Sequence, residues 1–590
     1  MKNRISLLTL FGSIAIVVIV AVITFPKNIL SWDTFGYYLY LPQLFIYNDL
    51  GINNLDTLQN IVGTYENTAT LYQIWQTETG EWLIRYTSGQ AILFSPFFGA
   101  AHLVALCTDF PADGFSLPYQ TGIFAGCLIY FAIALTLLRR ILLRFFSDKV
   151  TALTIFFLTF GTNLFANSIW AMAGIHSQLF FLYTILLLYT IRWHKRQSWS
   201  NILPIAIAAG LIIITRPTDV ICLIIPFLWN IYNKDSLREK IGLLIKNIPQ
   251  LIVCVIIVCA IGSIQMIYWK HFSGHWLIDS YNNPGEGLDF LFPHIWQTLF
   301  SFRKGWFIYT PMMLFAMAGF VLIWKRSKQH FLALALFVIA NIYLVSCWSC
   351  WWYAGSFGQR AYVQSYAVLS IPLGFFIQYS LERKSAQKGI LLTILSLCTL
   401  LNLFQTWQFR HGIINRSRMT RAAYFTNFFT TDPQKCDDRL LMIHRDASGI
   451  ETIDTNRNYV EKYLIKKDFG QDGFVTDSLT EFSPALQIPY NKITKKDHAW
   501  LRIKATVKQL SDTPSGDAVL VVTFCHKGNY KYRTYPLPST MAVEEWQEME
   551  IHYLSPEIRT TKDELNVYLW NRSRQPIAIK DIEIWASEEQ

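Results

Sequence analysis

The sequence predicts a polytopic α-helical membrane protein of about 11–13 spans, followed by a C-terminal all-β sandwich of jelly-roll type. The first observation behind this is a series of long apolar runs in a chain of 590 residues that is 52% hydrophobic and 15% aromatic. The second is that short clusters of Lys and Arg separate these runs, as topology determinants do. The third is a change after Trp407, where the chain becomes polar and its apolar residues alternate as they do in strands.

The first apolar run, residues 6–25, is uncharged and long enough to cross roughly 30 Å of hydrocarbon. No small-residue cleavage site follows it, so we expect an uncleaved signal anchor. Lys2 and Arg4 precede the run, and the preference for positive charge on the inner side therefore places Asp33 on the outer face.

The later spans follow from the same criteria. They are expected at residues 121–143, 150–168, 176–193, 201–215, 220–232, 250–268, 306–324, 331–346, 361–379 and 389–407. Basic clusters mark the inner turns, at residues 139–149, 192–196, 234–240, 325–328 and 383–388. Their alternation along the chain leaves the C-terminus outside. Residues 90–107 are also apolar but hold Pro96 and Gly99. A full crossing there would put Arg139 on the wrong side, so we expect a re-entrant or surface-lying helix pair buried in protein.

The outer segments are long and aromatic, which predicts that the activity of the protein lies on its outer face. Residues 26–89 form the first outer loop, and residues 281–293 and 347–359 form two more. Within the first loop, residues 36–50 have Leu41, Leu44 and Phe45 on one helical face, and tyrosines surround them. This pattern is typical of a helix lying in the membrane interface.

The domain boundaries follow from composition. Residues 1–410 form the multi-span domain, 411–430 a linker and 431–590 the extracytoplasmic sandwich. Alternating residues predict strands at 501–507, 518–524, 565–570 and 577–585, with turn signals at 513–516 and 527–529. The sandwich is either a structural cap or a glycan-binding domain. Its aromatic residues suit both roles, because aromatics in a sandwich usually belong to the core: Tyr530, Tyr532, Tyr535, Trp546, Tyr568 and Trp570.

Ionisable residues at the outer ends of the spans form the candidate site, because such groups are costly in a membrane and usually functional. Asp33 is followed by cations that lie far apart in sequence but at the same outer level: Arg85, His176, Arg216, Arg303, Lys304 and Arg360. Each alone is explained as a membrane anchor or an ion-pair partner. Together they predict a pocket for an anionic head group, since Arg gives bidentate contacts to phosphate.

The anchor is followed by Trp32-Asp33 and a long aromatic loop, and Arg85-Tyr86-x-x-Gly89 precedes an apolar run that contains Pro96. In these motifs and their order, the sequence from Met1 to Trp407 resembles the GT-C superfamily of membrane glycosyltransferases. Lys304-Gly305-Trp306-Phe307-Ile308-Tyr309-Thr310-Pro311 and the segment 351–360, which ends in Arg360, look like motifs of bacterial members. The wider relatives are protein O-mannosyltransferases and lipid A aminoarabinose transferases. The sandwich lies outside the resemblance.

The resemblance implies transfer of a sugar from a polyprenyl-phosphate donor, with inversion, to a glycan, lipid or protein acceptor outside a bacterial inner membrane. Asp33 would be the base that takes the acceptor's proton. The leaving phosphate would be bound by Arg85, Arg216, Lys304 and Arg360, with His176 as a further donor. Tyr37, Tyr38, Tyr86 and Trp352 would line the substrate. Many members carry a second acidic residue after the first, whereas Thr34 follows Asp33 here. We expect no cofactor and no bound metal.

Other classes are disfavoured to different degrees. The net charge of +10 sits in short clusters between apolar runs, which disfavours nucleic-acid binding. The motifs of P-loop ATPases, zinc proteases and serine hydrolases are absent. A polysaccharide polymerase or ligase, a flippase-type transporter and a receptor with a sensor domain stay open. Disulfides are also left open for Cys347 with Cys350 and for Cys436 with Cys525, since an outer compartment allows them.

Overall fold

Two compact units make up the protein, whose computed structural model describes residues 3–77, 80–170, 173–280, 286–445, 453, 458–511, 517–526, 528–538 and 542–589. The helical unit comprises residues 1–280, 293–347 and 351–436. The second unit comprises residues 437–590 together with 281–292 and 348–350, which come from two loops between helices. The expected linker, residues 411–430, therefore belongs to the helical unit, where Gln405 donates to the hydroxyl of Tyr424 over 2.7 Å.

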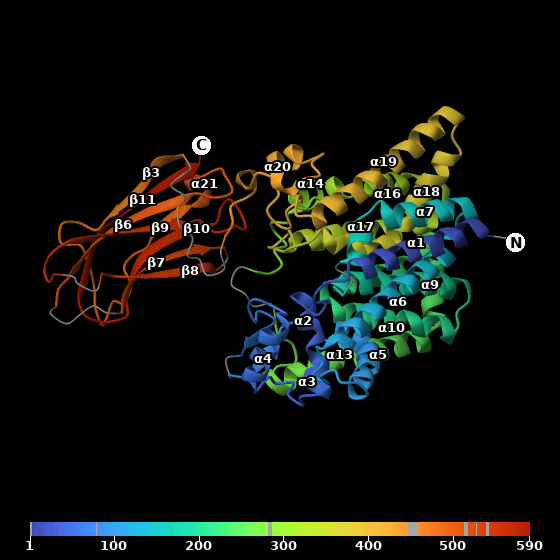
Figure 1. The fold of residues 1–590 in the computed structure, drawn as a ribbon, viewed down its shortest axis with the longest axis horizontal. Helices are drawn as coiled ribbons and strands as arrows, with labels where there is room; N and C mark the ends of the chain where they lie inside the picture. Colours follow the sequence, from blue (N-terminus) through green and yellow to red (C-terminus); the bar gives the residue numbers. More distant parts are fainter. Residues whose placement is uncertain are drawn as a thin grey trace. The chain divides into compact units, whose positions relative to one another are not determined.

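The predicted fold class is confirmed, because membrane-length helices precede two antiparallel sheets (Figure 1). Seven helices in the described part of the chain are long and apolar enough to cross a membrane. They are α1 (Arg4–Ile23), α5 (Gly89–Leu106), α6 (Leu117–Leu142), α9 (Ile175–Lys195), α13 (Ile248–Ser273), α17 (Lys328–Cys347) and α19 (Ser385–Arg410). Shorter helices complete this part of the unit: α7 (Asp148–Phe160), α8 (Leu164–Ile169), α10 (Trp199–Thr215), α11 (Ile224–Leu228), α12 (Lys234–Lys246), α16 (Met312–Arg326) and α18 (Tyr366–Leu381).

Several expected spans are broken by polar contacts or by proline. The span expected at 150–168 is wrong as one helix, because α7 ends before Gly161 and α8 begins at Leu164. Between them, the Asn163 amide donates to the carbonyls of Phe357 and Gln359, both over 3.3 Å. The span expected at 306–324 divides at Pro311 into α15 (Trp306–Tyr309) and α16. Those expected at 220–232 and 361–379 are likewise interrupted, by the 3₁₀ helices η1 (Pro217–Leu223) and η2 (Arg360–Ser365).

The helix pair expected at residues 90–107 is also wrong, because α5 is one continuous helix with Pro96 inside it. It packs antiparallel to α6, where Tyr130 donates to the carbonyl of Leu93 over 2.7 Å and the ring of His102 lies 6.0 Å from that of Tyr119. Packing against α6 supports the backbone around the proline, which alone would weaken a helix.

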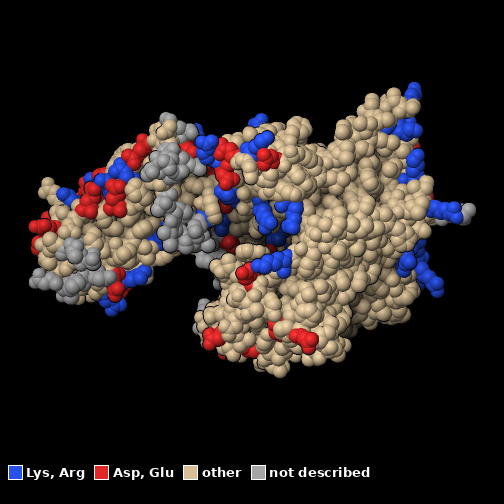
Figure 2. Space-filling view, in the orientation of Figure 1, with Lys and Arg blue, Asp and Glu red and all other residues tan. Residues whose placement is uncertain are grey.

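The basic turns lie together at the N-terminal end of α1. Arg139 donates to the carbonyl of Asn3 over 2.8 Å, and Asp148 accepts from the backbone of Ile5 over 2.8 Å. Further contacts join the other turns to this end: Phe145 with His330, His330 with Trp229, Lys240 with His194, and Arg326 with Glu382. Figure 2 shows Lys and Arg gathered there, at the right-hand edge, and a second group at the opposite end of the helical unit. The surface between them carries few charges, as expected for a membrane-facing belt.

The first outer loop forms two short helices in place of the single helix expected at 36–50. These are α2 (Asp33–Tyr38) and α3 (Tyr40–Phe45), and α4 (Leu55–Tyr65) and the hairpin of β1 (Ile74–Gln76) and β2 (Trp82–Ile84) follow. Leu41 is buried, but Leu44 and Phe45 are exposed, so the expected apolar face is only partly covered.

The second unit is the expected sandwich, and its four predicted strands are confirmed as β6 (Trp500–Gln509), β7 (Ala518–Cys525), β10 (Glu564–Asn571) and β11 (Ile577–Glu589). One sheet has the order β5-β10-β7-β8 and the other β3-β11-β6-β9, with β4 paired to β11. The strands missed from the sequence are β3 (Tyr459–Asp468), β4 (Phe474–Thr476), β5 (Leu486–Pro489), β8 (Asn529–Pro536) and β9 (Gln547–Leu554). The turn signal at 513–516 lies outside the described residues, as does Lys527 of the second turn.

Alternate residues of both sheets form one apolar core, which includes Leu501, Val522, Leu565 and Ile584. Tyr530, one of the candidate glycan-binding aromatics, is buried in this core and donates to Asp563. Among the described residues the structure contains no disulfide bond, so Cys347 is not joined to Cys350 in it, nor Cys436 to Cys525.

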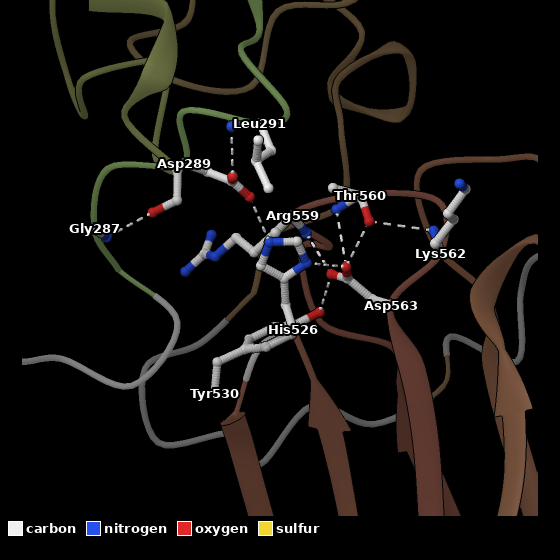
Figure 3. A network of polar contacts seen from close by, with 10 residues as sticks. Gly287, Asp289, Leu291, His526, Tyr530, Arg559, Thr560, Lys562 and Asp563 are labelled. Carbon is white, nitrogen blue, oxygen red and sulfur yellow. Dashed lines mark hydrogen bonds and ion pairs between the residues drawn. The ribbon is translucent and has the colours of Figure 1, made fainter. Parts of the chain in front are cut away.

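A buried ionic network lies within the second unit (Figure 3). His526 is held between two carboxylates, with Nδ1 2.8 Å from Asp563 and Nε2 2.7 Å from Asp289. Asp563 also accepts hydrogen bonds from the backbone of Arg559, the backbone and hydroxyl of Thr560, and the hydroxyl of Tyr530. Asp289 belongs to the loop segment 281–292, so the network fixes this segment to the sandwich.

Candidate functional site

A sharp change of chain direction after α1 positions Asp33. Trp32 has φ 54° and ψ −127°, a conformation that a non-glycine residue rarely adopts. Its backbone amide donates to the carbonyl of Asn67 over 2.8 Å, and its own carbonyl accepts from the side chain of Gln73 over 3.2 Å. These bonds hold the turn, so Asp33 is presented as the first residue of α2.

The Asp33 carboxylate is held by three side chains from three distant segments. Oδ2 lies 2.8 Å from the guanidinium of Arg360, and Oδ1 accepts hydrogen bonds from the hydroxyls of Tyr72 and Tyr86, both over 2.9 Å. The side chains of Asp33 and Arg360 are 33% and 23% exposed, so the pair is partly covered but reachable. Burial alone would raise the pKa of Asp33, but the charge of Arg360 and the hydrogen bonds from Arg360, Tyr86 and Tyr72 outweigh it and lower the pKa. Asp33 is therefore ionised at neutral pH.

Gly36 allows this arrangement, because a Cβ at that position would lie 2.3 Å from the ring of Tyr86. The ring centroid of Tyr37 lies 4.3 Å from that of Tyr86, so two of the three tyrosines expected to line the substrate lie beside Asp33. Tyr38 does not share this position. It is fully buried and donates to the carbonyl of Gly114 over 2.5 Å, which joins α2 to the loop before α6.

Hydrogen bonds from buried polar side chains fix the loop that carries Arg360. Asn163 binds its carbonyls at Phe357 and Gln359, and Gln359 donates to the carbonyl of Trp351 over 2.7 Å. The ammonium of Lys304 donates to the carbonyls of Ser356 and Arg416.

Lys304 itself is only 1% exposed. Burial lowers its pKa well below the usual range, and the nearby cations Arg303, Arg360 and Arg416 lower it further. Lys304 is thus buried against the loop, and its hydrogen bonds to the carbonyls of Ser356 and Arg416 position the loop.

A second polar chain joins the remaining cations to the same region. Arg216 forms an ion pair with Asp219 over 3.6 Å and donates to the hydroxyl of Tyr353 over 3.2 Å. Asp219 in turn accepts from Gln364 over 3.5 Å, and Gln364 lies 3.0 Å from Nδ1 of His176.

Tyr353 connects this chain to Arg360. The two residues belong to one loop, and the Tyr353 hydroxyl accepts from Arg216 over 3.2 Å. Burial raises the pKa of Tyr353, and the charges of Arg216 and Arg360 both oppose that rise. Its φ of 49°, followed by 54° at Ala354, marks a strained turn in the loop.

The structure thus brings Asp33, Tyr37, Tyr86, His176, Arg216 and Arg360 into one connected region. Arg85 precedes Tyr86, and its backbone amide donates to the carbonyl of Gln73 over 2.9 Å. Trp352 stacks against Arg303, whose guanidinium lies 4.1 Å from the ring centroid.

Four residues that the structure places in this region were not predicted from the sequence. Asp219 and Tyr353 lie inside the motifs that contain Arg216 and Arg360, so their position was a usable signal. Tyr72 and Gln364 carry no such signal, because their role depends on chain segments that meet only in the folded protein. Among the described residues, no group of three or more His, Cys, Asp or Glu comes together as metal ligands.

Comparisons with known proteins give structural neighbours only. A scan against protein-family models matches none of them, and a search of curated proteins gives no match. The chain is similar to ArnT from Cupriavidus metallidurans in the apo state, at 11% identity and a TM-score of 0.43, over 71% of this chain and 74% of that one. The structure of that ArnT bound to undecaprenyl phosphate gives 10% identity and a TM-score of 0.40 over the same shares.

The oligosaccharyltransferase of Archaeoglobus fulgidus in its apo form gives 12% identity and a TM-score of 0.41, over 74% of this chain and 60% of that one. At TM-scores of 0.43 or less and identities of 12% or less, these similarities assign neither a family nor a function.

Proposed function

We propose that this protein is a membrane glycosyltransferase that moves a sugar from a polyprenyl-phosphate donor to an acceptor hydroxyl, with inversion. The observation that carries the proposal is the ionised carboxylate of Asp33, partly exposed and held by Arg360, Tyr72 and Tyr86 directly after the first span. A second support is the linked set of polar groups around it, from Arg216 through Asp219 and Gln364 to His176.

In this proposal Asp33 acts as the general base. Its Oδ atoms would take the proton from the acceptor hydroxyl while that oxygen attacks the anomeric carbon from the face opposite the phosphate. The bond between the sugar and the phosphate breaks, and the electron pair leaves with the polyprenyl phosphate. Cations that bind this phosphate stabilise the transition state more than the bound donor, because negative charge builds up on the leaving oxygen.

Arg360 has two roles in this scheme. In the structure its guanidinium neutralises Asp33, which keeps the carboxylate ionised but makes it a weak base. A donor phosphate would compete for the same guanidinium, since Arg binds phosphate in a bidentate manner. Binding of the donor would then raise the basicity of Asp33 at the moment when the acceptor is to be deprotonated.

The remaining residues would hold the site in place. Arg216 is buried beside Asp219, and its Nη1 lies 3.6 Å from Oδ1 of Asp219, an ion-pair distance without a hydrogen bond among the described residues. A substrate oxygen would accept a hydrogen bond from this nitrogen. Tyr37 and Tyr86 would form an aromatic wall against the sugar ring. Lys304 and Asn163 would fix the loop that carries Tyr353 and Arg360.

The direct test is reconstitution of the full-length protein in lipid with radiolabelled polyprenyl-phosphate sugars, followed by identification of the labelled product. A labelled acceptor with inverted anomeric configuration supports the proposal, and the product also separates single transfer from polymerisation or ligation. Donor that crosses the bilayer unchanged would identify a transporter instead and contradict the proposal.

Asp33→Asn tests the assigned base, because it removes the proton acceptor and keeps the size of the side chain. We expect the rate of transfer to fall by about 10²–10⁴-fold with donor binding retained. Asp56→Asn is the matched control, since Asp56 is an exposed acid of the same outer loop. Activity of Asp33→Asn within a few-fold of the control would rule out the proposed role.

A further inference from the structure

A basic segment follows α19 at the end of the helical unit where the topology rule predicts few positive charges. Arg410, Arg416, Arg418 and Arg421 lie within residues 410–421, and no Asp or Glu occurs between Glu382 and Asp432. Contacts of Trp170 place this segment near Thr24. The Trp170 ring centroid lies 5.8 Å from the Arg410 guanidinium, and its indole N–H donates to the hydroxyl of Thr24 over 3.2 Å.

Thr24 caps the C-terminal end of α1, whereas the inner basic turns lie at its N-terminal end. The preference for positive charge on the inner side therefore does not explain these arginines.

The segment is folded onto the helical unit. Ile413, Ile414 and Met419 are buried, whereas Arg410, Arg416 and Arg421 are exposed. Gln408 donates to the carbonyls of Asn427 and Thr430, both over 2.9 Å, and so closes the segment onto the end of α19. Its apolar side chains thus face the protein, whereas Arg410, Arg416 and Arg421 are exposed and Arg418 is half-buried.

Arg303 extends this surface toward the loop 351–360. Its Nε donates to the carbonyl of Ser417 over 2.6 Å, and its guanidinium lies over the rings of Trp352 and Trp351 at 4.1 and 5.7 Å. We name Arg303, Arg416, Arg418 and Arg421 the basic surface.

Exposed aromatic residues lie next to the basic surface. Phe425 of α20 (Arg421–Thr426) is 57% exposed and Phe429 is 83% exposed, and Trp407 near the end of α19 is 38% exposed. Large apolar side chains are rarely left in water to this extent in one short segment. Arginines interleaved with aromatics directly after a membrane-spanning helix are typical of a segment that lies at the boundary between head groups and acyl chains.

We propose that the basic surface binds the phosphate head groups of anionic phospholipids, with Phe425 and Phe429 inserted beside them. The chemistry that recognises the ligand is the phosphate monoanion, to which guanidinium groups donate paired hydrogen bonds. A lipid fits better than a soluble phosphate, because the arginines are spread along an exposed segment that adjoins a span and exposed aromatics. This inference does not depend on the transferase activity.

The test compares lipids retained by the purified full-length protein, counted by native mass spectrometry after addition of phosphatidylglycerol or phosphatidylcholine. The variant is Arg416→Gln with Arg421→Gln, since both side chains are exposed and their loss does not disturb the core. The control is Lys234→Gln with Arg238→Gln on α12, which removes the same charge from exposed positions near the inner basic turns. Thermal unfolding of both double variants verifies that they fold.

We expect the wild type and the control to retain phosphatidylglycerol in preference to phosphatidylcholine, and the Arg416/Arg421 variant to lose at least about tenfold of that preference. Raised salt should weaken the preference in the wild type, because the contacts are charged and exposed. Equal retention in both double variants, or no preference for phosphatidylglycerol in the wild type, would overturn the proposal. Displacement of the lipid by millimolar glycerol phosphate would also overturn it, because the surface would then be a site for soluble phosphates.

Discussion

At the scale of single residues, the site depends on a carboxylate whose charge is maintained by its neighbours. Asp33 is partly buried, and burial alone would favour its neutral form, yet Arg360, Tyr86 and Tyr72 keep its pKa below the usual range. Because the folded pKa is lowered, the ionised form persists as the pH falls and is lost only when the pH drops through that lowered value. The charge of Asp33 is therefore a property of three segments that the fold brings together.

A pH profile tests this dependence. Tyr72→Phe removes one hydrogen bond to Oδ1 of Asp33 and leaves Arg360 in place. We expect the pKa of Asp33 to rise, so the acid limb of kcat/KM for sugar transfer should move to higher pH than in the wild type. Tyr65→Phe is the control, since Tyr65 lies in the same outer loop as Tyr72 but its hydroxyl bonds to Asp113, which lies between α5 and α6. If the acid limb of kcat/KM in Tyr72→Phe lay at the same pH as in the wild type, this hydrogen bond would not lower the pKa of Asp33.

The sequence was sufficient to single out ionisable residues, because placing an ionisable side chain in a membrane is costly in free energy. Asp33, His176, Arg216 and Arg360 lie in or beside apolar runs, and the structure connects all four. It gives Lys304 a different environment, because sequence shows that a cation is present but not that two carbonyls will surround it. Whether these residues bind a donor stays a prediction.

At the scale of elements, the predicted spans agree with the structure where the length of the apolar run alone determines the helix. The predictions were wrong where a polar side chain diverts the backbone. The run at 150–168 is apolar enough to continue as one helix, yet Asn163 binds two carbonyls of a loop about 200 residues later and the helix breaks there. No local pattern reveals such a partner. The predicted strands β6, β7, β10 and β11 are largely buried, whereas the short strands β4 and β5 and the more exposed strands β3 and β8 were missed, as was β9.

Close packing of α16 on α18 gives a prediction for helix association. A Cβ at Gly319 would lie 1.9 Å from the carbonyl oxygen of Pro372, so only glycine lets the two backbones approach. Gly319→Val should destabilise the helical unit by about 1–3 kcal/mol or more through overpacking. Thermal unfolding in detergent measures this, with Gly262→Val on α13 as control, because no atom lies within 4 Å of its added Cβ. Equal melting temperatures of the two variants would contradict the contact.

The network around Asp563 gives a prediction for the second unit (Figure 3). Asp563→Ala leaves His526, Tyr530 and the backbone of Thr560 without their acceptor in a site that is 1% exposed. Removing one partner of a buried charged network typically costs about 3–5 kcal/mol. We expect faster hydrogen exchange in β10 and in residues 286–292, since Asp289 is fixed to the sandwich through His526. Lys562→Ala, an exposed neighbour, should exchange as the wild type does, and the same rates in Asp563→Ala would refute the role of the network.

At the scale of the whole molecule, composition predicted two parts, and the structure divides the chain differently at their boundary. The change after Trp407 is one of hydropathy, but residues 411–436 still pack on the helical unit because Tyr424 and Gln408 bind there. Two short pieces of the loops between helices belong with the sandwich, since Ser349 pairs with Gly287 and Asp289 with His526. Contacts of this kind join segments that are distant in sequence, and a reading of composition along the chain does not detect them.

The orientation of the chain in the membrane is the last prediction, and it follows from the basic turns that gather at the N-terminal end of α1. If that end is cytoplasmic, the first outer loop and the sandwich are both extracytoplasmic. Single cysteines at Asp56→Cys and Glu548→Cys should then react with a membrane-impermeant thiol reagent added to intact cells, because both positions are exposed. Arg238→Cys, 82% exposed near the inner turns, should react only after the membrane is opened. Labelling of the wild type gives the background from the exposed Cys107 and Cys259. Protection of position 56 in intact cells would place Asp33 on the cytoplasmic side and would remove the basis for chemistry on an outward-facing lipid donor.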